Sequence, residues 1–320
     1  MNKIVERIEQ EAGVPGLVSV LAQRLTPTDL QSLLLEVYRL RSSQLPSSAI
    51  LANYETNRFV RPSAVAVEQL LRWEQVAFSQ LPQEFEALTL SPVCPLGTNS
   101  AVAAIDQNWA VATVRNTEVV SDSTNVLALE CAVRRRKLLR SNPRSADPAH
   151  LATSHRLLRA QHYLGPHLLA HFSAFTLCSA GRDQGGAQFE LSALGLHIRF
   201  YLRALRAFLG PRVPLHVSVT DFRQPARNEI LEAQLLAMIR AEFENVECVV
   251  DEQRTRGQGY YLDFCFLLHA STPSGQRLEL VDGGSVNWTQ QYLSSAKERL
   301  IISGLGSERL CQEFASGGAA

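Results

Sequence analysis

The stretch RTRGQGYY at residues 254–261 places two arginines, two glycines and two adjacent tyrosines within eight positions. Gly257 and Gly259 let the backbone take conformations that other residues avoid. A guanidinium beside such a turn can meet a phosphate or a carboxylate through two parallel hydrogen bonds. Taken alone, however, the stretch is also typical of an ordinary surface turn that enters a strand.

Two further segments join an arginine to small or polar neighbours. LLRAQ places Arg159 two residues before Gln161, and GLGSERL places Gly304 and Gly306 ahead of Arg309. Glycines in such a turn let the backbone approach a nucleotide, and a flat guanidinium stacks on a base. Each segment also has a simpler interpretation: Arg159 in a surface salt bridge on a strand, and Arg309 as an incidental residue of a strand–glycine–helix turn.

The composition is that of a globular protein without charge bias. The 320 residues are 46% hydrophobic and 19% charged, and 31 Lys and Arg balance 31 Asp and Glu. This balance argues against a large basic surface that binds nucleic acid, although it does not exclude a local basic patch. The densest basic run, RRRKLLR at 134–140, is typical of the solvated end of a helix, with a phosphate contact as the minority alternative.

The six cysteines indicate neither a zinc site nor a disulfide framework. They have no Cys-x-x-Cys spacing and no histidine at zinc-finger spacing, so we expect reduced core residues. The N-terminal MNKIVERIEQEAG has no apolar signal core, and no apolar stretch reaches the length of about 18 residues that spans a membrane. We therefore expect a cytoplasmic protein without a membrane segment.

A mixed set of elements must position these residues. Residues 1–62 are expected to be helical, because TPTDLQSLLLEVYRLR begins with Thr-Pro and carries apolar residues at helical spacing. A second amphipathic helix is expected over 63–81, and a strand over 85–93 that ends at Pro92. Two or three short strands are expected within 100–122.

The rest of the chain mixes strands and helices without strict β-α-β alternation. Asp122 and Thr124 are residues typical of a helix start, ahead of a helix over 123–140. Strands at 153–161 and 171–181 are expected to pair. Further helices are expected at 189–210, 228–243, 287–296 and 307–315, and further strands at 213–222, 262–270, 276–284 and 299–306. Antiparallel strands with interspersed helices indicate an α+β fold.

In this order the segments resemble the catalytic core of a class II aminoacyl-tRNA synthetase, and they are most similar to histidyl-tRNA synthetase. The resemblance covers roughly residues 63–315. It implies an antiparallel sheet of six or seven strands flanked by helices, in a core domain over 63–320 behind the helical region 1–62. It also implies a homodimer through the helix and strand that end at Pro92. An anticodon-binding domain is not expected after Arg309.

The resemblance also implies a nucleotide site. Arg159 would be a catalytic arginine that binds the α-phosphate of ATP and the carboxylate of the amino acid, because charge builds there during attack. Gln161 stands where a glutamate is usual, and Phe175 lies on the returning strand of the hairpin, in HFSAF. ATP and Mg²⁺ are the implied cofactors. The adenine and the γ-phosphate would be held by Gly304, Gly306 and Arg309.

The histidyl signature Arg-Gly-Leu-Asp-Tyr-Tyr is the most specific match, to RGQGYY. By this resemblance Arg256 is the second catalytic arginine and faces the α-phosphate, while Tyr260 and Tyr261 line the substrate pocket. Asp122 and Thr124 keep the acid-x-Thr spacing with which the family holds the substrate ammonium, and both residues could also cap the following helix.

The chain departs from the family where the amino acid is recognised. The Gln and Glu expected on the second hairpin strand fall on Ala174 and Cys178, and DGGSVNW keeps Gly283 and Gly284 but loses an Arg and a Tyr. Histidine as the substrate is therefore not implied.

Two main hypotheses of different class follow, and a third is weaker. The first is an enzyme that uses ATP to activate an amino acid, or a related carboxylate, as its adenylate, with a tRNA end, a carrier protein or a small amine as acceptor. The second is a non-catalytic subunit that senses an amino acid and regulates another enzyme, similar to the regulatory subunit of ATP phosphoribosyltransferase. A purely structural accessory subunit is a third possibility.

Overall fold

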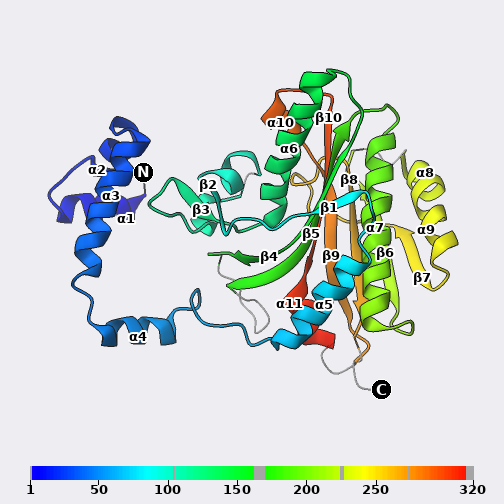
Figure 1. The fold of residues 1–320 in the computed structure, drawn as a ribbon, viewed down its shortest axis with the longest axis horizontal. Coiled ribbons are helices and arrows are strands. Elements are labelled where there is room, and N and C mark those ends of the chain that lie inside the picture. The colour runs from blue at the N-terminus through cyan, green and yellow to red at the C-terminus, as the bar shows by residue number, and fades with distance from the viewer. Residues whose placement is uncertain (1, 104, 162–169, 224–226, 273, 315–320) are drawn as a thin grey trace.

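A computed structural model of the chain shows a twisted sheet with helices on both faces and a separate group of helices at the N-terminus (Figure 1). The structure describes residues 2–103, 105–161, 170–223, 227–272 and 274–314. The helical character expected for the first 62 residues is confirmed, in α1 (Lys3–Glu11), α2 (Leu17–Ser19), α3 (Pro27–Ser42) and α4 (Ser47–Thr56).

The central sheet has eight strands in the order β1-β4-β5-β10-β9-β8-β6-β7. They are β1 (Phe85–Ala87), β4 (Ala149–Leu158), β5 (His171–Arg182), β6 (Leu215–Asp221), β7 (Val246–Val250), β8 (Phe264–Ser271), β9 (Arg277–Val286) and β10 (Glu298–Gly306). The expected α+β fold is confirmed, with eight strands rather than six or seven. At the two edges of the sheet, β1 pairs in parallel with β4 and β7 pairs in parallel with β6. The six strands between β1 and β7 are antiparallel to their neighbours.

Residues 93–103 and 105–119 belong to a small lobe, in which two strands and two helical turns replace the expected series of strands. β2 (Val93–Pro95) pairs with β3 (Thr117–Val119). The buried carboxylate of Glu118 accepts hydrogen bonds from the backbone N–H groups of Gly97 and Asn99 and from the side-chain amides of Asn99 and Gln107. Local side-chain hydrogen bonds of this kind compete with strand pairing, which alternation of apolar residues alone does not reveal.

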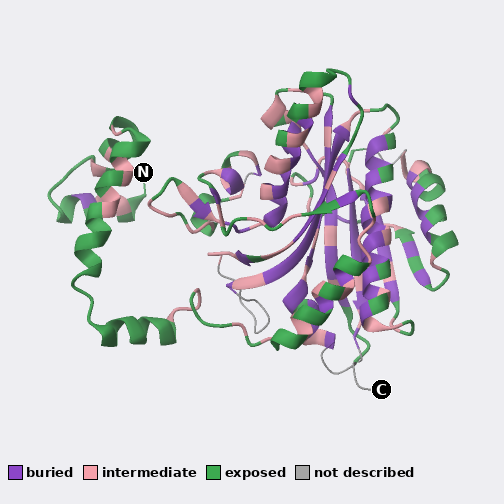
Figure 2. Cartoon of the chain, viewed as in Figure 1, coloured by how far each residue is buried: buried purple, intermediate pink, exposed green. Residues whose placement is uncertain are grey.

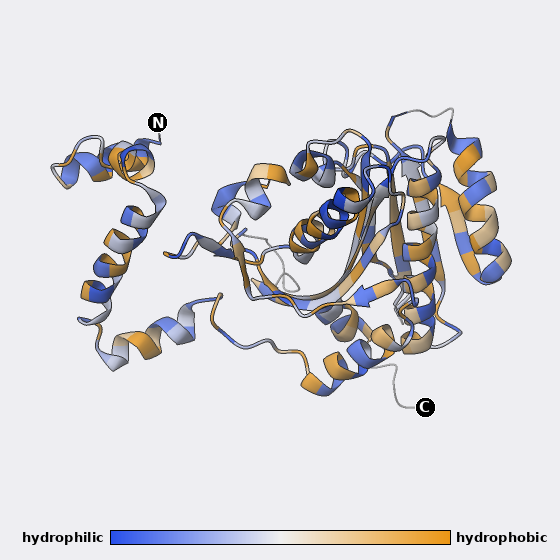
Figure 3. Cartoon of the chain, turned by 45° about the horizontal axis from the view of Figure 1, so that its top comes forward, coloured by the Kyte–Doolittle hydropathy of each residue, from blue (hydrophilic) through white to orange (hydrophobic). Residues whose placement is uncertain are grey.

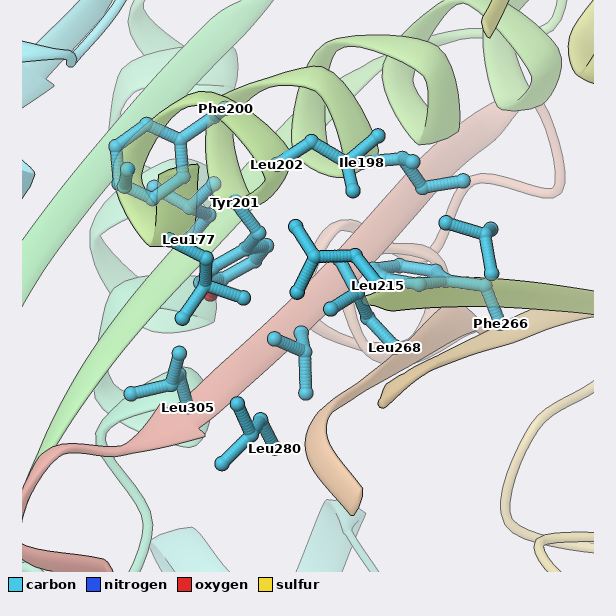
Figure 4. Close-up of a cluster of buried hydrophobic side chains, with 14 of the residues drawn as sticks. Leu177, Ile198, Phe200, Tyr201, Leu202, Leu215, Phe266, Leu268, Leu280 and Leu305 are labelled. Carbon is cyan, nitrogen blue, oxygen red and sulfur yellow. The ribbon is translucent and has the colours of Figure 1, made fainter. Parts of the chain in front are cut away.

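The larger core lies on one face of the sheet. This face is covered by α5 (Val67–Ser79), α7 (Gln188–Leu209), α8 (Asn228–Ile230), α9 (Ala237–Glu242) and α11 (Ser307–Phe314). Figure 4 shows Phe200 and Tyr201 of α7 and Phe266 and Leu268 of β8 among the side chains of this core. The indole Nε1 of Trp73 donates to Ser307 Oγ at 3.0 Å, which ties α5 to α11.

The opposite face is covered by α6 (Ser123–Ser141) and α10 (Trp288–Leu293), over a smaller core that includes Cys178 and Ile302. The helix expected over 123–140 is confirmed, but its basic end is only partly solvated. Arg135 is fully buried and its guanidinium donates to both carboxylate oxygens of Glu298, at 2.8 and 3.0 Å. The prediction of a solvated run was therefore wrong for this residue, because its partner lies far away in sequence.

The N-terminal helices stand apart from the core in Figure 1 and are mostly exposed in Figure 2. Apolar positions of this arm are interspersed with polar ones in Figure 3. Within residues 2–62 Glu9 is the buried residue, and its carboxylate accepts from the N–H groups of Gly16 and Val18. The arm is anchored at its end, where Arg58 Nη2 donates to the Ala160 carbonyl at 2.7 Å.

The six cysteines are free and buried, as the sequence predicts. Among the described helices, none is long and apolar enough to cross a membrane.

Candidate functional site

A cavity of about 500 Å³ lies on the α6 face of the sheet. Residues of neighbouring strands form the floor of the cavity, because every second side chain of a strand points to the same face of the sheet. Thr176 of β5 pairs with Gly304 of β10, which pairs with Asp282 of β9, and all three line the cavity. Ile105 of the lobe also lines the cavity.

The cavity brings together eleven of the fifteen residues that the sequence singled out. These are Asp122, Thr124, Arg159, Gln161, Ala174, Arg256, Tyr260, Tyr261, Gly304, Gly306 and Arg309. They come from segments far apart in the sequence, and the fold brings these segments together.

Asp122 has the capping role that the sequence predicts and also pairs with an arginine of the cavity. It is the N-cap of α6, where Oδ1 accepts from the Thr124 N–H at 2.9 Å and from the Thr124 hydroxyl at 2.7 Å. Its other oxygen, Oδ2, accepts from Arg159 Nη2 at 3.2 Å. The same carboxylate therefore starts the helix and orients an arginine in the cavity.

Arg159 is held from three sides. Besides Asp122, its Nε donates to the Ser121 carbonyl at 2.9 Å, and its guanidinium lies 5.3 Å from the ring centroid of Phe172. A fixed guanidinium of this kind can meet an anionic group without reorganising.

Phe175 does not line the cavity. It is fully buried in the larger core, where its ring stacks on Phe200 at 5.3 Å. Odd-numbered residues of β5 face that core and even-numbered ones face α6, so Phe172 is the phenylalanine of this strand that lines the cavity. The expectation that Phe175 contacts ATP is therefore corrected.

Cys178, Gly283 and Gly284 also lie outside the cavity. Cys178 is buried beneath α6 and its Sγ lies 3.5 Å from the Thr124 carbonyl. A Cβ on Gly283 would lie 2.5 Å from the ring of Phe266, and one on Gly284 would lie 2.6 Å from the ring of Tyr261. The two glycines are thus required for close packing of the sheet, with no direct contact to the cavity.

The 254–261 loop presents one arginine to the cavity and buries the other. Arg256 is exposed and its Nη1 donates to Glu279 at 2.6 Å. Arg254 is buried, and its Nη2 donates to Asp282 Oδ1 at 2.9 Å. Burial raises the pKa of the Asp282 carboxyl, against the opposing effect of the Arg254 guanidinium.

Gly257 explains the shape of this loop. Its φ of +88° is strained for a residue with a side chain, and a Cβ there would lie 2.9 Å from the ring of Tyr261. Tyr261 therefore packs between Gly257 and Gly284. Its neighbour Tyr260 packs against Trp288, with ring centroids 6.0 Å apart, and burial raises the pKa of the Tyr260 hydroxyl.

The third arginine lies at the C-terminal side of the cavity. Arg309 is exposed in the first turns of α11 and makes no ion pair or hydrogen bond with the residues that the structure describes. Its neighbour Glu308 is buried and accepts from Arg156 Nη2 at 2.5 Å and from Ser63 Oγ at 2.9 Å. Arg309 is the cavity arginine without an acidic partner among the described residues.

Sequence reasoning missed several cavity residues. They include Ile105, Trp109, Phe172, Glu279 and Asp282. The alternation of β5 and β9 could have placed Phe172 and Asp282 on the correct face once the register was known. The lobe residues carry no motif, and only the fold shows that they reach the cavity.

The described residues contain no group of three or more His, Cys, Asp or Glu side chains that could hold a metal ion. Glu279 and Asp282 both line the cavity, but each already accepts from an arginine. The site is therefore dominated by arginine–carboxylate pairs.

Comparison with known proteins gives structural relatives only. No protein-family model and no curated protein matches the chain. Its structure is similar to that of apo histidyl-tRNA synthetase from Staphylococcus aureus, with a TM-score of 0.59, 14% identity, and coverage of 81% of this chain and 70% of that one.

Two further solved structures are similar. One is an ATP phosphoribosyltransferase regulatory subunit/histidyl-tRNA synthetase from Bacillus halodurans, with a TM-score of 0.58, 13% identity, and coverage of 80% of this chain and 82% of that one. The other is the RNA binding domain of threonyl-tRNA synthetase from Cryptosporidium parvum, with a TM-score of 0.55, 8% identity, and coverage of 78% and 64%. At these identities the likeness shows the fold, and the chain has the fold of the class II aminoacyl-tRNA synthetases.

Proposed function

We propose that the protein binds ATP and an amino acid, or a related carboxylate, in the 500 Å³ cavity and joins them as an adenylate. The observation that carries the proposal is the convergence of Arg159, Arg256 and Arg309 on one cavity from three separate segments. Three guanidinium groups suit the charges of a triphosphate and a carboxylate. The volume also falls within the range of about 300–1,000 Å³ that is usual for small-molecule sites.

The reaction needs orientation and charge stabilisation rather than a protein nucleophile. A carboxylate oxygen of the amino acid attacks the α-phosphorus, the bond to the bridging oxygen breaks, and pyrophosphate leaves. Arg159 would stabilise the charge that builds on the α-phosphate, because Asp122 and Ser121 already fix the position of its guanidinium. Arg256 would contact the same phosphate once its ion pair with Glu279 is broken.

The two ends of the substrates would contact other residues of the cavity. The substrate ammonium would lie at Asp122 and Thr124, two residues that line the cavity. The exposed Arg309 would meet the γ-phosphate, with Gly304 and Gly306 giving the nucleotide room above β10.

Mg²⁺ would enter this cavity together with ATP, bound to the phosphates of the nucleotide. Mg²⁺ usually keeps several waters and takes one or two carboxylates together with substrate phosphates. Glu279 and Asp282 are the cavity carboxylates on β9 that could contribute such oxygens. The ion would neutralise phosphate charge.

The test is amino-acid-dependent exchange of pyrophosphate into ATP, run with each of the twenty amino acids. Exchange with one amino acid, lowered about 10²- to 10³-fold in Arg159→Ala, is the expected result, because removing one preorganised donor to a developing charge has an effect of that size. Arg203→Ala is the matched control, since Arg203 pairs with Glu242 on the surface of the opposite face. Equal loss in both variants would contradict the assignment.

The alternative is a regulatory, amino-acid-sensing subunit. One observation favours it: Arg159 and Arg256 are both engaged by carboxylates, of Asp122 and Glu279. A protein of that kind would bind an amino acid, raising the thermal unfolding temperature, but would exchange no pyrophosphate with any of the twenty.

A further inference from the structure

Five basic side chains gather where α6 ends, and we call them the basic patch. They are Arg136, Lys137, Arg140, Arg144 and Arg182. The first three are exposed on α6, and the fourth is exposed in the loop that follows it. Arg182 ends β5 and lies beside this loop, because its Nη1 donates to the Pro143 carbonyl at 3.3 Å. Residues from two separate elements therefore contribute to one positive surface.

The three helical members of the basic patch lie on one side of α6. At roughly 100° per residue, Arg140 projects between Arg136 and Lys137, within an arc of about 100°. Residues three or four positions apart on a helix are neighbours, with Cβ atoms about 5–6 Å apart. Arg135 projects instead toward the sheet, where it pairs with the buried Glu298. The helix thus presents a compact group of positive charges to solvent.

The basic patch keeps its positive charge. None of its five members pairs with an acidic residue in the part of the chain that the structure describes. The nearby Glu130 pairs with Arg134 instead. Asp147 is the acidic residue of the loop after α6, and it adds one negative charge against five positive ones. A protein whose formal net charge is zero therefore carries a strongly positive surface at this place.

The end of a helix does not by itself account for the basic patch. A cation in the last turn interacts favourably with the helix dipole, and Arg140 is the member in that turn. Arg136 and Lys137 lie earlier in α6, and Arg182 belongs to a strand. Like charges on neighbouring helical positions repel each other. A polyanionic partner would remove this repulsion.

The composition and shape of the basic patch favour a chain of phosphates. Four of its members are arginines, whose guanidinium groups bind phosphate through two parallel hydrogen bonds. They spread along a helix and onto a strand end, whereas a single small anion needs groups that converge. Single-stranded nucleic acid is usually held by aromatic stacking, and the basic patch has no aromatic member. Helices that bind membranes present several large apolar residues, whereas on α6 Val133 is the exposed one.

We propose that the basic patch binds the phosphate backbone of a nucleic-acid duplex without reading its sequence. The surface is separate from the cavity of the candidate site. Asp122, which lines that cavity, caps one end of α6, and Arg140 lies in the last turn at the other. A helix of 19 residues is about 28 Å long. The proposal therefore does not rest on adenylate chemistry.

The test is fluorescence anisotropy of a labelled DNA duplex of arbitrary sequence, titrated with the whole protein at salt concentrations from about 50 to about 200 mM. Each phosphate contact contributes about −0.9 to the slope of the logarithm of the affinity against the logarithm of the salt concentration. Five contacts predict a slope of about −4.5, or roughly 500-fold weaker binding at the higher salt concentration. Absence of binding at the lowest salt concentration would overturn the proposal.

A double variant locates the contacts. Arg136→Gln combined with Arg140→Gln removes two of them and should change the slope to about −2.7. Glutamine and arginine have similar helix propensities, so α6 should persist. Arg212→Gln combined with Arg277→Gln is the matched control, because it removes two exposed arginines that have no acidic partner among the described residues. The control should keep the original slope, and equal slopes in the two double variants would contradict the assignment.

Other partners and another site are tested in the same way. The single strands of the same DNA and vesicles that contain anionic phosphatidylserine serve as competing probes. Tighter binding of either than of the duplex would overturn the proposal. Arg309→Gln tests whether the duplex occupies the cavity of the candidate site. Loss of binding in Arg309→Gln, with an unchanged slope in the variant of Arg136 and Arg140, would place the duplex at that cavity and refute the basic patch.

Discussion

At the scale of residues, Asp122 shows how one side chain links folding to the proposed chemistry. One carboxylate oxygen caps α6 through Thr124, and the other holds Arg159 in the cavity. The sequence predicts the cap but not the contact with Arg159, because Arg159 follows β4 and approaches Asp122 only in the folded sheet.

Substitutions of Asp122 should separate the two roles. Asparagine retains a cap oxygen but removes the charge, so Asp122→Asn should leave the free energy of unfolding within about 0.5 kcal/mol and still weaken amino-acid binding at least tenfold. Asp122→Ala should additionally lose about 1 kcal/mol of stability through the missing cap. Urea denaturation and calorimetric titration measure the two effects. Equal stability of the two variants would contradict the capping role.

His197 predicts a dependence of stability on pH. It is buried between the hydroxyls of Ser179 and Ser303, at 2.8 and 2.7 Å, and burial together with nearby His150 holds its pKa well below the usual value. The unfolded chain takes up a proton near pH 6.5 and the folded protein does not. Stability should therefore fall as the pH drops below about 6.5, by up to about 1.4 kcal/mol per pH unit from this residue.

Urea denaturation between pH 7.5 and 5.5 measures this dependence. His197→Gln can keep a hydrogen bond to either serine but cannot take up the proton, so its stability should change less with pH than that of the unaltered protein. Identical pH dependence in the two proteins would show that His197 does not contribute to it.

At the scale of elements, the sequence predicts regular helices and long strands well and side-chain direction less well. The helix over 123–140 and the pairing of β4 with β5 follow from capping and alternation. The face of the sheet on which the Phe175 side chain lies depends on which side of the hairpin packs against the larger core. A shift of one residue in strand register would move this side chain to the other face. The lobe was missed because Glu118 organises it through contacts that periodicity does not record.

The buried pair of Arg135 and Glu298 joins α6 to β10, and the basic run in the sequence gives no indication of it. Removing one partner leaves an uncompensated buried charge, so Glu298→Gln should lower the free energy of unfolding by about 3–5 kcal/mol. Arg134→Gln is the control, since Arg134 pairs with Glu86 and Glu130 at the surface and should leave the urea midpoint nearly unchanged. Equal midpoints for the two variants would contradict this role.

At the scale of the whole molecule, apolar surface is concentrated on α5 and the N-terminal arm. Val67, Leu71 and Phe78 of α5 are exposed, and at 100° per residue they lie on one face of the helix. Short helices such as α1 and α4 gain most of their stability from packing, and the arm buries little of its apolar surface on this chain. We propose that α5 and β1 form a homodimer interface.

Light scattering of the purified protein tests this assembly. Leu71→Glu places a charge within the exposed apolar face of α5 and should convert a dimer to a monomer, because an unpaired charge is costly to bury. Val249→Glu makes a similar change at β7, the far edge of the sheet, and should remain dimeric. A dimer that persists in Leu71→Glu would exclude this helix from the interface.

We propose that the protein forms an adenylate in the cavity lined by Arg159, Arg256 and Arg309. The most direct measurement is native mass spectrometry of the protein after incubation with ATP, Mg²⁺ and a mixture of amino acids, without any acceptor. We predict one bound aminoacyl-adenylate per cavity, which is lost in Arg159→Ala. An amino acid bound without AMP, in the unaltered protein and under the same conditions, would contradict adenylate formation and indicate a sensor.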